Sequence, residues 1–191
     1  MVGPERVRIL AVCTGNICRS PVAEALLTRG IFELGVLADV RSAGTSAAVG
    51  QPVDPATQRL LARRGVALPD DFAARQLQVD DLRDADLILT MTLEQRREAL
   101  ELFPGAVRRT FTLTEFAALV SASEEPLFLD DLRPNRSVLL AASVDYDVPD
   151  PHGRRRRHHV AAYEMVDDAT KAILSAILAG RLVISRDSVA G

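Results

Sequence analysis

The sequence has no tryptophan, only two cysteines and few aromatic residues, which make up 4% of its 191 positions. Both cysteines lie in one short motif, which argues against a secreted disulfide scaffold and suits a reducing cytoplasm. The formal net charge of −3 predicts no general attraction to nucleic acid. The start of the chain shows no signal peptide, and Gly180 and Arg181 interrupt the apolar stretch 173–184. We therefore expect no membrane span and a cytoplasmic location.

The stretch 8–24, RILAVCTGNICRSPVAE, is the one around which the chain is organised. Its apolar residues 7–12 predict a strand. Pro21 predicts the first turn of a helix, because the NH that proline lacks would have no partner there. A cysteine, Cys13, stands directly after the strand, and Arg19 stands just before the helix.

The residue types between strand and helix predict a loop that binds an oxyanion above a thiol. Such a loop can aim successive backbone NH groups into one concavity, to which the helix N-terminus adds positive potential. Gly15 and Asn16 tolerate the left-handed backbone that this requires. Arg19 offers a planar pair of donors, and a positive field favours the thiolate form of Cys13, which could attack bound phosphorus in line. A buried structural thiol in an ordinary turn is the alternative, but it does not explain why these residues fall together.

The run CTGNICRSP, at 13–21, resembles the phosphate loop of the low-molecular-weight protein tyrosine phosphatases, a family similar in fold to thioredoxin-coupled arsenate reductases. The resemblance continues through SAGT at 42–45, ARQL at 74–77 and ADLILTM at 85–91. It implies a phosphomonoester hydrolase that needs no cofactor and acts on phosphorylated proteins, most of all on phosphotyrosine. We also see no cluster with the spacing of metal ligands. The site residues implied by the loop are the nucleophile Cys13, the phosphate-binding residues Thr14, Gly15, Asn16, Ile17, Cys18 and Arg19, and the supporting residues Ser20 and Ser42.

Strands and helices alternate along the chain, which predicts a parallel sheet with helices on both faces. A ligand would then bind beyond the carboxyl ends of the strands, where the loop after Cys13 lies. The resemblance implies a single-domain α/β three-layer sandwich over 1–191, with four strands in the order 2-1-3-4. The elements that we expect are strands at 7–12, 40–45, 85–91 and 107–113, and helices at 21–34, 55–64, 93–102, 114–120 and 160–179.

A second chemical motif, VPDPHG at 148–153, contains a carboxylic acid between two prolines. A phosphoryl transfer from an alcohol needs the leaving oxygen to be protonated, and a carboxyl group can do this. Pro149 and Pro151 stiffen the backbone around Asp150. An isolated Asp-Pro pair would be a generic turn, but the family resemblance implies that Asp150 is the general acid. Asp145 and Asp147 are weaker candidates, since no proline follows either of them.

Two charged or irregular stretches are less like the family. Residues 121–147 predict an insertion, either a tolerated surface loop, which we favour, or a lid over the site. Four arginines at 154–157 predict a solvated face, with attraction of acidic or phosphorylated partners as the alternative.

Several departures from the family pattern leave other functions open. Aromatic residues that flank the substrate in many members are replaced here by His152 and by the small residues 46–50, and Phe72 and Thr92 stand where many members carry His and Asp. A phosphoarginine phosphatase is similar, but those enzymes carry Thr where this loop has Ile17. An arsenate reductase coupled to a small thiol and a phosphate-binding regulator without turnover are the remaining alternatives.

Overall fold

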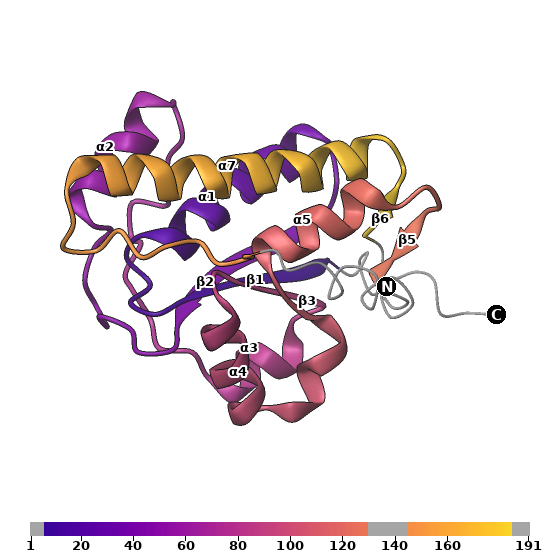
Figure 1. Cartoon of the computed structure of the whole chain (residues 1–191), viewed down its shortest axis with the longest axis horizontal. Helices are drawn as coiled ribbons and strands as arrows, with labels where there is room; N and C mark the ends of the chain where they lie inside the picture. The colour runs from indigo at the N-terminus through magenta and orange to yellow at the C-terminus, as the bar shows by residue number, and fades with distance from the viewer. Residues whose placement is uncertain (1–5, 130–144, 185–191) are drawn as a thin grey trace.

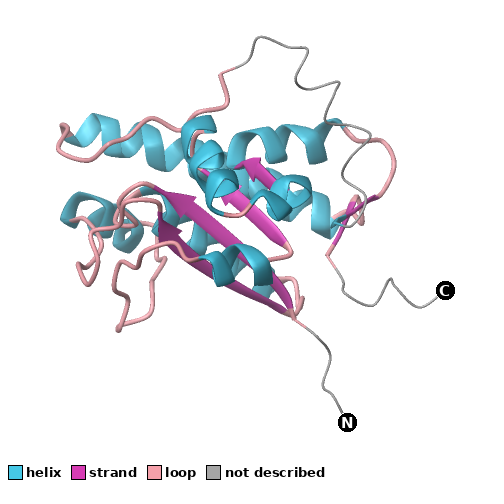
Figure 2. Ribbon diagram, turned by 90° about the horizontal axis from the view of Figure 1, so that it is seen from below, coloured by secondary structure: helices cyan, strands magenta, loops and turns pink. Residues whose placement is uncertain are grey.

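A four-stranded parallel sheet forms the centre of the protein. We describe its computed structural model over residues 6–129 and 145–184. The strands β1 (Val7–Cys13), β2 (Ala38–Gly44), β3 (Leu87–Thr90) and β4 (Thr110–Thr112) lie in the order β2-β1-β3-β4. This confirms the predicted order. The strand arrows in Figure 2 point to one edge of the sheet, where loops gather.

Helices cover both faces of the sheet, as expected for the α/β class (Figure 1). On one face lie α1 (Arg19–Glu33), α2 (Pro55–Arg63), α5 (Leu113–Ala122) and α7 (Arg156–Leu178). On the other lie α3 (Val79–Asp84) and α4 (Leu93–Leu102). The short helix α3 was not among the helices expected from the sequence.

The apolar core has two parts, one on each face of the sheet. Ile9 and Ala11 of β1 pack into the larger part, with α1, α5 and α7. Leu10 and Val12 face the smaller part, which α3 and α4 cover. This alternation is what a strand buried on both faces requires. The loop after Cys13 is therefore held at the end of a strand that lies between β2 and β3 in the sheet.

The expected fourth strand at 107–113 was wrong in its first half. Residues Pro104–Arg109 form a 3-10 helix, η1, and β4 begins only at Thr110. Proline at the start of η1 favours a helical turn, because its fixed φ suits that position. Ala106 is buried in the smaller core, and its carbonyl accepts a hydrogen bond of 2.8 Å from Thr110 Oγ1. These contacts hold the turn closed ahead of the strand.

The last helix begins earlier than the expected 160. It starts at Arg156, so half of the arginine run lies in its first turn. Arginine is a good helix former, and long charged side chains can extend into solvent from a helix end. All four arginines at 154–157 are exposed, as both the solvated-face interpretation and the attraction of acidic partners require.

The stretch expected as an insertion at 121–147 begins within the folded core. The strand β5 (Leu127–Phe128) pairs in parallel with the strand β6 (Leu182–Val183). Together they form a short second sheet that was not predicted. Leu127 and Leu182 are both buried in the larger core. The surface-loop interpretation was therefore wrong for 127–128, while 130–144 lie outside the described residues.

Candidate functional site

The thiol of Cys13 lies buried at the carboxyl end of β1, where the chain turns toward α1. Its Sγ accepts hydrogen bonds from the backbone NH of Asn16, at 3.2 Å, and from Ser20 Oγ, at 3.0 Å. Both donors stabilise negative charge on the sulfur. Ser20, expected to support the nucleophile, therefore contacts it directly.

Asn16 braces the loop from below. Its φ is 54°, which is the left-handed conformation that asparagine tolerates better than most residues. The side-chain Nδ2 donates to Ser20 Oγ at 3.0 Å and to Ser42 Oγ at 2.8 Å. Its Oδ1 accepts from the backbone NH of Arg75 at 2.9 Å. The fully buried amide thus ties the loop to the ends of two other segments.

Glu24 extends this network and was missed by the sequence reasoning. Ser42 Oγ donates to its carboxylate, and burial raises the pKa of Glu24 above its ordinary value. The residue comes from the first helix, whose buried residues after Ser20 are all apolar. A carboxylate within that face was the one signal in the sequence that could have indicated it.

The segment after β2 wraps closely around the phosphate loop. Backbone NH groups of Ser46 and Ala48 donate to the carbonyls of Thr14 and Gly15, each at 3.0 Å. A Cβ atom at Gly44 would lie 2.4 Å from the carbonyl oxygen of Thr14. Glycine is therefore required at the third position of SAGT by the close approach of two backbones.

A second residue missed from the sequence, Gln95, holds the other side of the loop. Its Nε2 donates to Thr14 Oγ1 and its Oε1 accepts from the backbone NH of Met91, both at 3.0 Å. Thr92, which replaces an acidic residue of the family pattern, caps α4 by accepting from the NH of Gln95 at 3.2 Å. The loop is thus fixed by side chains from β2, α1 and α4.

Arg19 links this loop to the second motif. Its side chain is only 4% exposed, and Nη1 donates to the carbonyl of Val148 at 2.9 Å. Nη2 lies 3.3 Å from Asp150 Oδ2, whose side chain is half exposed. Within the described part of the chain, Arg19 Nε is buried without a hydrogen-bond partner. Buried donors of this kind usually have a partner, so an oxyanion is the natural group to complete it.

Of the acidic residues near the second motif, Asp150 alone is placed beside Arg19. The Oδ1 of Asp147 accepts from the NH of Leu93 at 2.8 Å, at the start of α4, and that of Asp145 accepts from the NH of Asp147. Asp150 Oδ1 accepts from the NH of His152 at 3.2 Å, which shapes the turn after it.

These segments enclose a cavity of about 270 Å³. Small residues at 46–48 form one wall. The segment 148–153 around Asp150, here called the acid loop, forms another. All of the expected phosphate-binding residues line the cavity except Asn16, which belongs to the same loop but is fully buried. The lining residues are Cys13, Thr14, Gly15, Ile17, Cys18, Arg19, Ser46, Ala47, Ala48, Asp150 and His152.

The second thiol, Cys18, differs from Cys13 in its surroundings. Burial raises the pKa of Cys18 to about 12, partly offset by a hydrogen bond with Thr57. This thiol is therefore protonated near neutral pH. Both cysteines are free.

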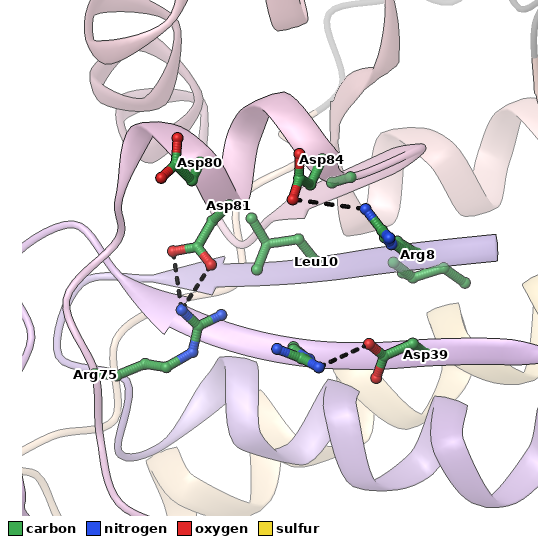
Figure 3. A pocket seen from close by; sticks show the side chains of 10 residues that line it. Arg8, Leu10, Asp39, Arg75, Asp80, Asp81 and Asp84 are labelled. Atoms are coloured by element: carbon green, nitrogen blue, oxygen red, sulfur yellow. Dashed lines mark hydrogen bonds and ion pairs between the residues drawn. The ribbon is translucent and has the colours of Figure 1, made fainter. Parts of the chain in front are cut away.

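Another hollow, of about 290 Å³, lies beside α3 and the sheet (Figure 3). It is lined by charges that already pair with one another. Asp81 accepts two hydrogen bonds from Arg75, at 2.7 and 2.8 Å, and Asp84 lies 3.5 Å from Arg8. Its lining residues carry no thiol or hydroxyl group, so this hollow is not the catalytic candidate.

A thiol beneath converging backbone donors, with an arginine and a carboxylic acid over the same cavity, defines the class of cysteine-dependent phosphatases. A model of the family "low molecular weight phosphotyrosine protein phosphatase" matches residues 8–128. The chain belongs to this family.

Known proteins similar to the chain include both tyrosine and arginine phosphatases. A low molecular weight protein-tyrosine-phosphatase of Streptomyces coelicolor is 34% identical over 175 residues, which cover 89% of this chain and 93% of that protein. The solved YwlE arginine phosphatase of Geobacillus stearothermophilus is 28% identical, with a TM-score of 0.70 over 91% of this chain and 94% of its own. A low molecular weight tyrosine phosphatase from T. tengcongensis is 26% identical, with the same TM-score over 88% and 98%.

Within residues 6–129 and 145–184, no helix is apolar over the length that a bilayer crossing requires.

Proposed function

We propose that the chain is a protein-tyrosine-phosphatase that works through a phosphocysteine on Cys13. The observation that carries this proposal is the convergence of Cys13, Arg19 and Asp150 on one cavity. We propose that the whole chain acts as one domain, and its two free thiols suit a reducing cytoplasm.

The first step is attack of the Cys13 thiolate on phosphorus. The S–P bond forms as the bond from phosphorus to the leaving oxygen breaks, and the Asp150 carboxyl gives its proton to that oxygen. Arg19 and the NH groups of the loop bind the equatorial oxygens, where negative charge develops. The substrate oxyanion then shares Arg19 with the Val148 carbonyl, and Asp150 is released toward the leaving group.

The second step is hydrolysis of the phosphocysteine. The Asp150 carboxylate takes a proton from water, the water oxygen attacks phosphorus, and the S–P bond breaks. Cys13 leaves as a thiolate, which the hydrogen bonds from Ser20 and from the NH of Asn16 stabilise. Inorganic phosphate departs and the enzyme is restored.

The substrate class follows from the walls of the cavity. Ile17 offers an apolar contact to a phenyl ring, which favours phosphotyrosine. Phosphoarginine is a second candidate, because the structurally similar YwlE protein is an arginine phosphatase and the wall at 46–48 carries no aromatic residue.

Turnover of matched peptides bearing phosphotyrosine, phosphoserine or phosphoarginine tests the choice. We expect the highest kcat/KM on phosphotyrosine and no turnover of arsenate with a small thiol. A higher kcat/KM on phosphoarginine would contradict the phosphotyrosine assignment. Loss of all turnover in Cys13→Ser, with vanadate binding retained, separates catalysis from simple phosphate binding.

A further inference from the structure

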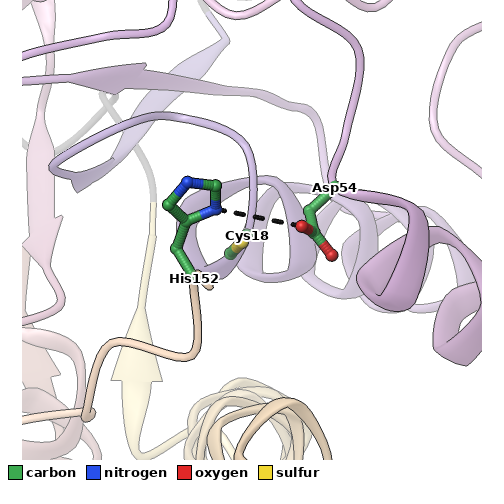
Figure 4. Close-up of side chains that lie close together, drawn as sticks. All are labelled: Cys18, Asp54 and His152. Atoms are coloured by element: carbon green, nitrogen blue, oxygen red, sulfur yellow. Dashed lines mark ion pairs between the residues drawn. The ribbon is translucent and has the colours of Figure 1, made fainter. Parts of the chain in front are cut away.

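Three side chains that can bind a metal meet beside the phosphate loop (Figure 4). One ligand atom each from Cys18, Asp54 and His152 lie within 4.8 Å of one another. Cys18 stands at the start of α1, Asp54 at the start of α2, and His152 in the turn after the acid. Because they come from three distant segments, their spacing in the sequence gave no sign of a metal site.

The carboxylate of Asp54 is already held in position. Its Oδ1 caps α2 by accepting from the NH groups of Ala56, at 2.9 Å, and Thr57, at 3.3 Å. The other oxygen, Oδ2, lies 3.9 Å from His152 Nδ1. The side chain is only 15% exposed, so a cation would meet a fixed oxygen rather than a mobile one.

A second imidazole supports this carboxylate from the protein interior. The Nδ1 of buried His159 lies 3.6 Å from Asp54 Oδ1 and 3.3 Å from Thr57 Oγ1. Imidazole and carboxylate contacts of this kind orient metal ligands in known sites.

The chemical types of the three ligand groups indicate which metal ion would bind. Thiolate, imidazole and carboxylate together are typical of zinc, whereas magnesium and calcium prefer oxygen ligands. Bonds of about 2.0–2.3 Å to a tetrahedral zinc place ligand atoms roughly 3.3–3.8 Å apart, so the cluster must contract slightly. His152 is 62% exposed, and its side chain can rotate inward to achieve this.

Zinc binds the thiolate form of cysteine, so the S–Zn bond forms as the Cys18 thiol loses its proton to the solvent.

We propose that Cys18, Asp54 and His152 form a zinc site at the wall of the catalytic cavity, and that zinc bound there inhibits turnover. His152 is joined to Asp150 by the hydrogen bond from its NH to Oδ1. Zinc would therefore tie the acid loop to the start of α1 and restrain Asp150, which must move to the leaving oxygen. Inhibition rests on the proposed function, whereas zinc binding does not.

Zinc binding to the full-length, reduced protein is measured by competition with a chromophoric chelator. We expect one zinc in the wild type and in Cys13→Ser, and affinity reduced about tenfold or more in His152→Ala and Cys18→Ser. His158→Ala is the matched control, since His158 lies outside the cluster, and it should bind zinc as the wild type does. Cobalt in place of zinc should show a thiolate charge-transfer band that survives Cys13→Ser and disappears in Cys18→Ser.

Two results would overturn the proposal. One is absence of zinc binding in the wild type. The other is binding that is lost in Cys13→Ser and retained in His152→Ala, which would place zinc on the nucleophile. Because position 152 is exposed, His152→Ala carries the test even if Cys18→Ser does not fold. If zinc binds as expected but turnover is unchanged by it, the site stands and the inhibitory role is wrong.

Discussion

Asp150 and Asp147 are close in sequence but have different partners. The carboxylate of Asp150 faces Arg19 across the cavity, whereas that of Asp147 accepts from the NH of Leu93. Asp150→Asn should slow hydrolysis of esters with poor leaving groups by about 10²–10⁴-fold, the usual scale of general acid catalysis. Esters with good leaving groups should be slowed less, because they need less protonation. The measurement is kcat/KM over a series of aryl phosphates.

The matched control is Asp147→Asn, which should leave the dependence on the leaving group unchanged. An equal loss across all leaving groups in Asp150→Asn, or a steeper dependence in Asp147→Asn, would refute the assignment of the acid.

The second cysteine, Cys18, leads to a prediction of how the free energy of unfolding depends on pH. Folding raises the pKa of Cys18 to about 12, so between about pH 8.5 and 12 the unfolded thiol ionises while the folded one keeps its proton. The folded state then binds more protons than the unfolded state, and the free energy of unfolding must fall as pH rises through this window.

Urea unfolding of the wild type and Cys18→Ala at about pH 7 and about pH 10 measures this effect. The wild type should lose more stability than the variant between the two values. Parallel losses would show that burial does not hold the proton on Cys18.

At the residue level, the sequence indicated those side chains that belong to a contiguous motif. The positions of Cys13, Arg19 and Ser20 are set by one loop, so their spacing predicted their meeting. Glu24 and Gln95 contact the network only because the fold brings α1 and α4 to it. Such contacts depend on packing between elements, which periodicity does not reveal.

At the level of elements, the end of β2 and the phosphate loop approach each other so closely that there is no room for a side chain at position 44. Gly44→Ala would place Cβ 2.4 Å from the Thr14 carbonyl, which must then shift. A displacement of about 1 Å in a catalytic loop can cost on the order of 10²-fold in rate, so we expect a loss of that order in kcat/KM.

The control for this change is Gly105→Ala, for which the three heavy atoms nearest the new Cβ, at 3.0–3.6 Å, all belong to the ring of Phe103, a side chain away from the loop. It should keep wild-type kinetics. Normal turnover in Gly44→Ala would show that close approach at this point does not position the loop.

Elements with strong local signals were predicted well, and short ones were not. Asp54 with Pro55, and Thr92, marked the starts of α2 and α4 correctly, because a cap is a local feature. The pairing of Leu127–Phe128 with Leu182–Val183 could not be predicted, since two-residue strands carry no periodicity and their partner is remote in sequence.

On the scale of the whole molecule, this small sheet joins the end of α5 to the region after α7. Leu182 is 2% exposed, whereas nearby Leu178 is 76% exposed. Leu182→Ala should lower the free energy of unfolding by about 2–5 kcal/mol, because it leaves a cavity in the larger core. Leu178→Ala should change it by less than about 0.5 kcal/mol.

Chemical denaturation of both variants measures the difference. Equal stabilities would show that the second sheet does not contribute to the core. The result matters for function because α7 also carries His159, which supports Asp54 beside the site.

The central claim is that Cys13 carries the phosphoryl group between substrate and water. Rapid quenching of Asp150→Asn with a substrate that has a good leaving group, followed by peptide mass spectrometry, tests it most directly. The variant can form the intermediate but lacks the base that activates water, so a phosphoryl group should accumulate on the peptide containing Cys13. In Cys13→Ser there should be no turnover. Turnover without phosphoryl transfer to Cys13, or with transfer to another residue, would contradict the mechanism.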